Sequence, residues 1–221
     1  MWLKLLGKQQ KKMYLCKQDI LNILNKPDGL FIRPLLNLNQ ISELTIDFRL
    51  GFDFLVSIQG REPFINASKN EDNVGQVSSF FQETRRKLGE TFLLHPNQTV
   101  LTSSLEYIKL PSDIFAILTM RSSYSRLGLN ISSIIQPGYS GCISLELTNN
   151  NNNPINLTIG ACIFQVRLYR LNDKVNYFAK RRKYICQVRP FVPTMDHDED
   201  LERLNILWKK ENNVASLPTI I

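Results

Sequence analysis

Short runs in which hydrophobic and polar residues alternate, separated by turn residues, fill most of the chain from about Thr91 onward. Alternation of this kind is typical of β-strands with one buried face, because successive side chains point to opposite faces. Proline, glycine and asparagine residues interrupt the pattern between the runs. Many short strands at this spacing indicate an all-β barrel or sandwich. The predicted strands are residues 99–103, 115–120, 130–135, 142–148, 155–159 and 161–168.

The pattern near the start of the chain is helical instead. Apolar residues recur at helical spacing from about Lys17 to Leu24, and this predicts a short helix. Pro27, Asp28 and Gly29 follow at once and are expected to end it.

Three further segments complete the expected organisation. Residues 44–50 alternate as a strand, with Asp47 and Arg49 on the face opposite the apolar side chains. Residues 68–89 are polar and charged, and they predict a loop or a short helix. Residues 149–153 are five asparagines, which we expect to form a hairpin loop between two strands.

Length and composition favour one globular domain with terminal additions. The chain has 221 residues, of which 43% are hydrophobic and 21% are charged. We expect a basic extension at residues 1–12, the main domain at residues 13–195, and an acidic stretch, short helix and tail at residues 196–221. The longest apolar runs are too short to span a bilayer, so no membrane partner is expected.

Charge and cysteine usage narrow the classes of partner. The net charge of +7 favours an anionic partner, and much of it lies in residues 8–12, 85–87 and 180–183. Aromatic residues do not alternate with these basic residues as they do in single-strand binders, so no nucleic-acid partner is expected. The four cysteines form no Cys-x-x-Cys pair, which fits a reducing cytoplasmic location and argues against a zinc site.

The residues best suited to catalysis are concentrated in residues 121–129 and 136–147. These segments combine fixed cations, adjacent hydroxyls, glycines and one carboxylate, which suits a nucleoside triphosphate held against a general acid or base. Strand alternation places Ser144 and Glu146 on one face, opposite three apolar neighbours. A carboxylate at this position could also be an exposed side chain or the partner of an arginine.

Six motifs in order along the chain resemble the dCTP deaminases, a branch of the dUTPase superfamily. The resemblance implies a distorted antiparallel β-barrel or jelly-roll of the dUTPase-like type, with a short N-terminal helix and peripheral helices. It also implies a homotrimer whose active sites lie between subunits. The motifs are residues 13–20, 44–51, 92–96, 121–129 with 137–146, 160–165 and 183–187.

The resemblance further implies a reaction and the residues that perform it. The expected activity is hydrolysis of dCTP to dUTP and ammonia, with Glu146 as the proton shuttle. Ser122 and Arg126 are expected to position the water and the base, since a hydroxyl donates and accepts and an arginine stays cationic. The expected substrate-binding residues are Arg121, Ser123, Gln136, Tyr139, Gln165, Tyr177, Lys183, Tyr184 and Gln187.

Within that set, Tyr139 is expected to pack near the deoxyribose. Residues 177–190 are expected to close over the triphosphate, with Lys183 supplying a point charge and Gln187 a neutral hydrogen bond. Mg²⁺ would be held through the substrate phosphates, and no protein ligands to a metal are expected. No zinc is expected, because the sequence has no Cys-x-x-Cys, which the signature of zinc deaminases requires.

Two departures from the family pattern concern base and sugar recognition. Residues 130–136 are shorter than the hairpin whose backbone reads the pyrimidine in the family, and Gln136 stands where the family has an aspartate. Two alternatives to simple deamination therefore stay open. One is diphosphate hydrolysis of dUTP, against which the missing aspartate argues. The other is a nucleotide-binding or sensing homologue with altered base specificity.

Overall fold

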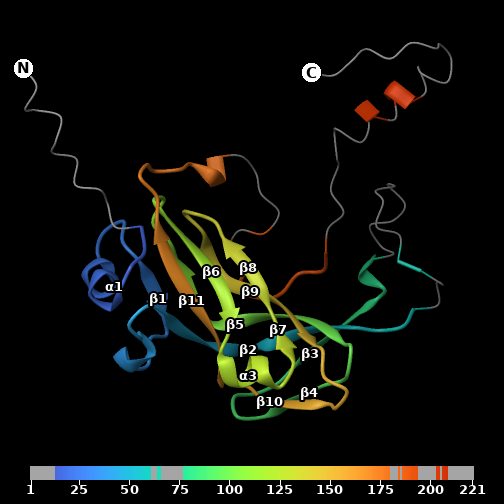
Figure 1. Ribbon diagram of the computed structural model, residues 1–221. Helices are drawn as coiled ribbons and strands as arrows, with labels where there is room; N and C mark the ends of the chain where they lie inside the picture. Colours follow the sequence, from blue (N-terminus) through green and yellow to red (C-terminus); the bar gives the residue numbers. More distant parts are fainter. Residues whose placement is uncertain are drawn as a thin grey trace, which may run out of the picture.

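The computed structural model describes residues 13–60, 64–65, 77–179, 184, 186–193, 203–204 and 206–208 of the chain (Figure 1). The expected extension at residues 1–12, Lys183, and most of the expected tail lie outside these residues. The described part is built mainly from antiparallel β-strands, and this confirms the predicted fold class.

The described strands form one large curled sheet and a small second sheet. The nine-stranded sheet has the order β7-β9-β5-β2-β11-β6-β8, with β1 paired to β5 and β3 paired to β2, and β10 pairs with β4 in the second sheet. The strands are β1 Phe31–Arg33, β2 Ile46–Ser57, β3 Phe81–Arg85, β4 Thr91–Leu94, β5 Thr99–Lys109, β6 Ile114–Met120, β7 Leu129–Asn130, β8 Ser132–Ile135, β9 Ser140–Asn149, β10 Ile155–Thr158 and β11 Cys162–Arg170. The short helices are α1 Lys17–Ile23, η1 Leu38–Gln40, α3 Ser122–Arg126 and η3 Tyr177–Ala179.

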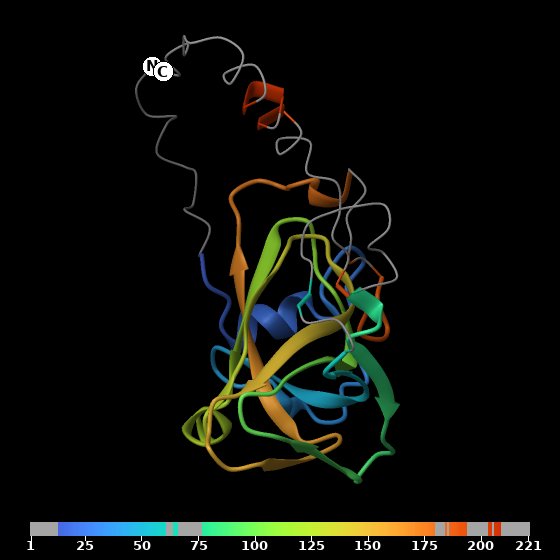
Figure 2. The same cartoon turned by 90° about the vertical axis from the view of Figure 1, so that its right-hand side faces the viewer.

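The long strand β2 curls the sheet by pairing with different neighbours along its length. Its first part pairs with β11 and its later part with β5, and the β5 register shifts between Leu50 and Phe54. Gly51 lies inside this irregularity, where a Cβ atom would sit 2.5 Å from the Ser103 carbonyl oxygen. Irregular pairing bends strands, and Figure 2 shows the strands curving around the interior.

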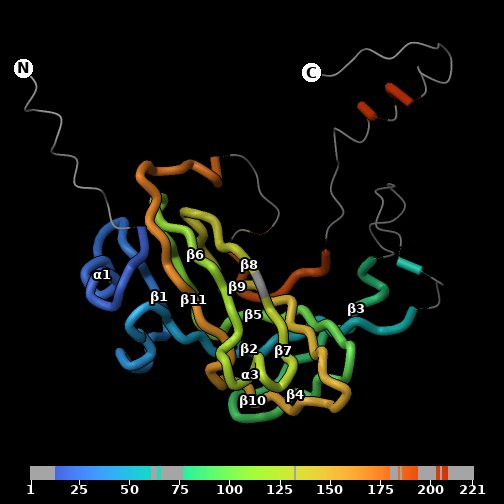
Figure 3. Tube along the Cα trace, in the orientation of Figure 1, coloured from blue at the N-terminus to red at the C-terminus, as the bar shows by residue number. Residues whose placement is uncertain are grey.

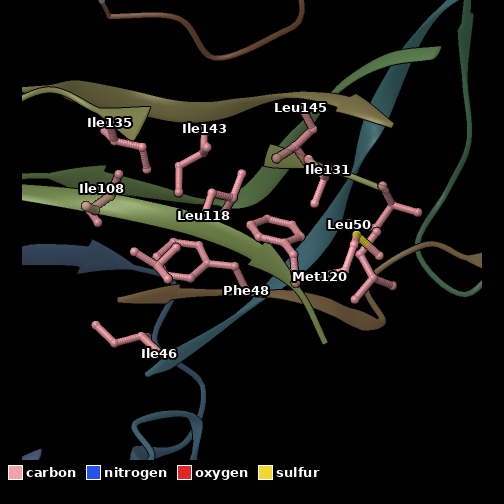
Figure 4. Close-up of a cluster of buried hydrophobic side chains, with 14 of the residues drawn as sticks. Ile46, Phe48, Leu50, Ile108, Leu118, Met120, Ile131, Ile135, Ile143 and Leu145 are labelled. Atoms are coloured by element: carbon pink, nitrogen blue, oxygen red, sulfur yellow. The ribbon is translucent and has the colours of Figure 1, made fainter. Parts of the chain in front are cut away.

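Hydrophobic side chains fill the inner face of the curled sheet (Figure 4). The rings of Phe48 on β2 and Phe164 on β11 stack with centroids 5.8 Å apart, and both are fully buried. Leu118 on β6 and Leu145 on β9 close the same cluster from other strands. Burial on this scale is the main favourable contribution to folding, and it holds β9 in a fixed position.

A buried ionic network joins β2, β5 and η1. Glu106 has no exposed surface, and it accepts hydrogen bonds from the Arg49 backbone N–H at 2.8 Å and the Arg49 guanidinium at 3.0 Å. Gln40 donates to the same carboxylate at 3.0 Å and accepts from Arg49 at 2.6 Å. Burial raises the pKa of Glu106, and the Arg49 hydrogen bonds oppose that rise. Arg49, which was predicted to lie on the face of residues 44–50 opposite the apolar side chains, is therefore one partner of a structural ion pair with Glu106.

The helix expected near residues 17–24 is confirmed as α1, which ends at Ile23. The short helix predicted within residues 196–221 is partly described, and residues 203–204 and 206–208 are helical there. The strand expected over residues 130–135 is wrong as a single element. Leu129–Asn130 pairs with β9, whereas Ser132–Ile135 pairs with β6, so the chain changes partner strands at Ile131.

The expected loop or helix at residues 68–89 contains a strand that the hydrophobic pattern missed. Phe81–Arg85 forms β3, and among the described strands it pairs with β2 alone. Its side chains are exposed or half-buried on both faces, so the strand has no apolar alternation. An edge strand of this kind is stabilised by backbone pairing, which a sequence pattern does not record.

The five asparagines do not form the expected hairpin loop, because β9 and β10 pair with different strands. Side-chain hydrogen bonds turn the chain instead. The buried Asn149 donates to the carbonyls of Leu94 and Asn153 at 3.1 and 2.9 Å, and it accepts from the Asn151 N–H at 2.9 Å. Asparagine readily bonds to nearby backbone in this way, so the run guides the chain from one sheet to the other.

The ionic network gives a stability prediction. We expect Arg49→Met to lower the free energy of unfolding at neutral pH by about 3–5 kcal/mol, because it leaves the buried Glu106 charge uncompensated. Arg85→Met is the matched control: Arg85 also pairs with a carboxylate at 3.0 Å, that of Asp53, but its side chain is 56% exposed and Arg189 stays 3.8 Å from Asp53, so the expected loss is about 1 kcal/mol or less. Urea unfolding would measure both.

The pH dependence of the Arg49→Met deficit follows from the raised pKa of Glu106. A carboxyl whose pKa is higher in the folded than in the unfolded state binds a proton on folding, so its contribution to stability falls as pH rises. The deficit should therefore shrink as pH is lowered and Glu106 becomes neutral. A deficit equal to that of the Arg85 control, or one that grows at acid pH, would contradict the assigned role of this pair.

Candidate active site

Strand β9 presents a polar face to a cavity of about 580 Å³. As predicted, Ser144 and Glu146 share this face, while Ile143, Leu145 and Leu147 are buried on the other. The cavity is further walled by parts of β5 and β8, by η3, and by Tyr184, Gln187, Pro190, Phe191 and Pro193. The strand therefore connects the hydrophobic core directly to the candidate site.

Glu146 provides the cavity's carboxylate. Its side chain is open to solvent, yet the surrounding protein atoms still desolvate it and raise the pKa of the carboxyl, opposed by its own backbone N–H. Among the described residues, Glu146 takes part in no ion pair. The structure therefore does not support the alternative in which this carboxylate is the partner of an arginine. A raised pKa suits a group that both takes and returns a proton.

Half of the twelve predicted site residues meet around this cavity. They come from the turn before β9, from β9 itself, from η3 and from the carboxyl-terminal segment. These residues are Gln136, Tyr139, Glu146, Tyr177, Tyr184 and Gln187.

Tyr139 forms a rigid wall of the cavity. Its ring is 9% exposed, and its hydroxyl donates to the Cys142 carbonyl at 2.6 Å. Burial raises the pKa of this phenol, so it remains a neutral donor. Phe178 of η3 packs near the ring with centroids 6.4 Å apart. A fixed aromatic surface of this kind suits the apolar side of a sugar, and the packing of Tyr139 near the deoxyribose stays a prediction.

The described part of the carboxyl-terminal segment lies along β9 (Figure 3). The Cys186 N–H donates to the Ser140 carbonyl at 2.8 Å, and the Cys142 N–H donates to the Gln187 carbonyl at 2.7 Å. Gly141 permits this approach: it has φ +152°, and a Cβ atom there would lie 2.9 Å from the Gln187 carbonyl oxygen. Backbone hydrogen bonds therefore hold one wall of the cavity in place.

Five other predicted site residues do not line the cavity, and four of them lie on α3 or directly before it. Ser122, Ser123 and Arg126 are exposed on α3, and none of them is among the described residues that line the cavity. Arg121 precedes α3, lies 3.6 Å from Asp47 and donates to the Cys162 carbonyl at 3.3 Å. Figures 1 and 2 place α3 and the η3 segment at opposite ends of the sheet. Residue-level motifs alone did not predict this separation.

The fifth of these residues is Gln165. Gln165 is half-buried on β11, where it is paired with Asp47 of β2 and Thr119 of β6 and does not line the cavity. Lys183 lies outside the described residues. Sequence reasoning did not name Phe191, which follows the predicted closing segment and also lines the cavity.

Within the described ranges, no group of three or more His, Cys, Asp or Glu side chains lies close enough together to hold a metal ion. The described helices include none with the length and hydropathy needed to cross a membrane.

Comparison with known proteins identifies the family. Residues 15–171 match the family model described as dCTP deaminase-like. The dCTP deaminase of Haemophilus influenzae is 38% identical over 198 residues, which cover 85% of this chain and all of that protein. The "dCTP deaminase, dUMP-forming" of Methanobrevibacter smithii is 30% identical over 179 residues, covering 78% of this chain and 90% of that protein.

A solved structure supports the fold. The 2′-deoxycytidine 5′-triphosphate deaminase of Agrobacterium tumefaciens aligns with a TM-score of 0.54 and 22% identity, covering 72% of this chain and 46% of that one. The family match spans the strands that carry Glu146 and the residues around α3. The chain therefore belongs to the dCTP deaminase-like family.

Proposed function

We propose that this protein hydrolyses dCTP to dUTP and ammonia. The observation that carries the proposal is Glu146: a carboxyl with a raised pKa, on the polar face of β9, in a cavity walled by the residues expected to bind the nucleotide. Membership of the dCTP deaminase-like family supports the same substrate.

The chemistry requires one group to move a proton between three places. Glu146 accepts a proton from water as the water oxygen attacks C4 of the cytosine, and it passes that proton to the ring nitrogen N3, where it stays in the uracil product. It then takes the second proton from the new C4 hydroxyl and delivers it to the departing amine. The C4–O bond forms, the C4–N bond breaks, and ammonia leaves. Because the pKa of Glu146 is raised by desolvation, the protonated form is easier to reach than for a glutamate surrounded by water alone.

Assembly into a homotrimer is part of the proposal. Within a single chain, the cationic and hydroxyl side chains of α3 do not line the cavity. The proposed trimer brings Arg121, Ser122, Ser123 and Arg126 of one copy to the cavity of the next, where they would complete the site. The exposed position of Ser122, Ser123 and Arg126 in the single chain supports this arrangement.

Binding of the triphosphate is assigned to the carboxyl-terminal segment. Tyr184 and Gln187 line the cavity, and Lys183 is adjacent in sequence. Mg²⁺ would enter bound to the phosphates and neutralise part of their charge, since the described residues offer no cluster of ligands for it.

Diphosphate hydrolysis after deamination is the second candidate, because one relative is named dUMP-forming. That reaction needs a base aimed at a water beside the α-phosphate. Among the described residues that line the cavity, Glu146 is the acidic one, and Gln136 is an amide that cannot accept a proton at neutral pH. We therefore favour release of dUTP. Nucleotide binding without turnover is the third possibility.

The role of Glu146 can be tested by Glu146→Gln. The amide is nearly isosteric but cannot cycle a proton, so kcat should fall roughly 10²–10⁴-fold while dCTP still binds. Glu83→Gln on the exposed strand β3 is the matched control and should leave kcat unchanged. Ammonia release and equilibrium binding measure the two properties. If Glu146→Gln retains more than about a tenth of the wild-type rate, Glu146 is not the proton shuttle.

The shared site can be tested by mixing inactive variants. Glu146→Gln and Arg126→Ala should each be inactive, but a mixture reassembled from separated chains should regain about a quarter of wild-type activity. Random assembly places an intact cavity beside an intact α3 at one interface in four. A mixture of Glu146→Gln with Gln187→Ala should regain nothing, because both residues belong to one cavity. Equal behaviour of the two mixtures would contradict a site shared between copies.

A further inference from the structure

The side chain of Gln187 is buried, and of its two amide atoms only the oxygen is hydrogen-bonded within the described residues. Gln187 is 2% exposed and lines the cavity. The Ser144 hydroxyl donates to its Oε1 at 2.5 Å. Its Nε2 has no hydrogen-bond partner among the described residues. A buried donor without an acceptor is unfavourable, so an acceptor that does not belong to the described residues, such as an atom of a ligand, would stabilise this amide.

The other buried amide side chains in the described part of the chain are bonded at both ends. Nε2 of Gln40 donates to the Asp47 carbonyl and to Glu106, and its Oε1 accepts from Arg49. Asn149 likewise donates through Nδ2 and accepts through Oδ1. These two amides are structural. Gln187 differs from them in that its free donor belongs to a residue that lines a cavity.

Strand β9 fixes both the backbone and the side chain of Gln187. The Cys142 N–H holds the Gln187 carbonyl at 2.7 Å, and Ser144, two residues further along β9, holds the amide oxygen. A serine hydroxyl can also accept, so Ser144 would hold the amide in place in either orientation, whereas an anionic phosphate oxygen only accepts hydrogen bonds. A bound phosphate therefore favours the orientation in this structure, in which Ser144 holds Oε1 and Nε2 is the available donor.

We infer that Ser144 is a positioning residue that holds the Gln187 amide in place, so that Nε2 donates to an oxygen of the β- or γ-phosphate of the bound nucleotide. The inference rests on the proposed function and assigns a role within that same site. An N–H donor suits an anionic phosphate oxygen, and such charge-assisted hydrogen bonds are stronger than neutral ones.

Position along β9 and local charge favour the distal phosphates. Ser144 and Glu146 are two residues apart on one face, about 7 Å along the strand, which leaves room for the sugar between the reacting carbon and the phosphates. The four residues 180–183, just before Tyr184 in sequence, are all basic. The most anionic part of a nucleotide is therefore expected beside this segment.

An isosteric pair of variants isolates the hydroxyl. Ser144→Thr retains it, and Ser144→Val replaces it with a methyl group of the same shape. Both are placed in the Glu146→Gln background, so that binding of dCTP, dCDP and dCMP can be titrated without turnover. We expect Ser144→Val to weaken dCTP roughly tenfold relative to Ser144→Thr, and dCMP by less than about twofold.

Thr148→Val is the matched control. Thr148 lies on the same face of β9, and its hydroxyl is bonded to that of Thr99 at 2.9 Å, away from the residues that line the cavity. This variant should leave all three affinities unchanged. Thermal unfolding of each protein checks that the fold is retained, and Ser144→Ala, which adds no bulk, repeats the test if Ser144→Val is unstable.

The outcomes separate this inference from the proposed function. Equal weakening of dCTP and dCMP would mean that Ser144 only holds the segment in place, and equal affinities for Ser144→Thr and Ser144→Val would mean that the hydroxyl does nothing; either result overturns the inference. The wild-type protein could release no dUTP while Ser144→Val still lowered the affinity for dCTP selectively. The proposed reaction would then fail, and the positioning role of Ser144 would stand.

Discussion

Strand β9 is the constraint on which the rest of the site depends, because its two faces belong to different environments. Ile143, Leu145 and Leu147 are locked into the core, and β5 pairs along nearly the whole strand. A strand held in this way cannot slip by one residue without exchanging its faces. Ser144 and Glu146 are therefore fixed in the cavity by the burial of their neighbours. Hydrophobic packing, rather than any polar contact, sets the position of the proposed proton shuttle.

The same strand also organises the carboxyl-terminal segment. The described part of that segment is attached by hydrogen bonds to Ser140, Cys142 and Ser144. Arg189 adds a longer ion pair, 3.8 Å from Asp53 of β2. Contacts of this kind are individually modest in water, so a ligand that bonds to Gln187 would add a substantial share of the attachment. Closure of the site and binding of the nucleotide are thus expected to be coupled.

The sequence predicted the features that depend on local periodicity and missed those that depend on partner strands. The shared face of Ser144 and Glu146 follows from the two-residue period of a strand, and the helix α1 follows from its apolar spacing. The break at Ile131 and the edge strand β3 could not be predicted, since each is decided by which distant strand the backbone meets. The separation of α3 from the cavity is likewise a property of the fold and not of any motif.

The central claim is that the cavity converts dCTP to dUTP and releases the product without cleaving the phosphate chain. Purified protein incubated with Mg²⁺ and each deoxynucleoside triphosphate in turn, with nucleotides separated and ammonia and pyrophosphate quantified, tests it most directly. The account predicts dUTP and an equal amount of ammonia from dCTP, with no pyrophosphate. Formation of dUMP and pyrophosphate, or binding of dCTP without any product, would contradict it.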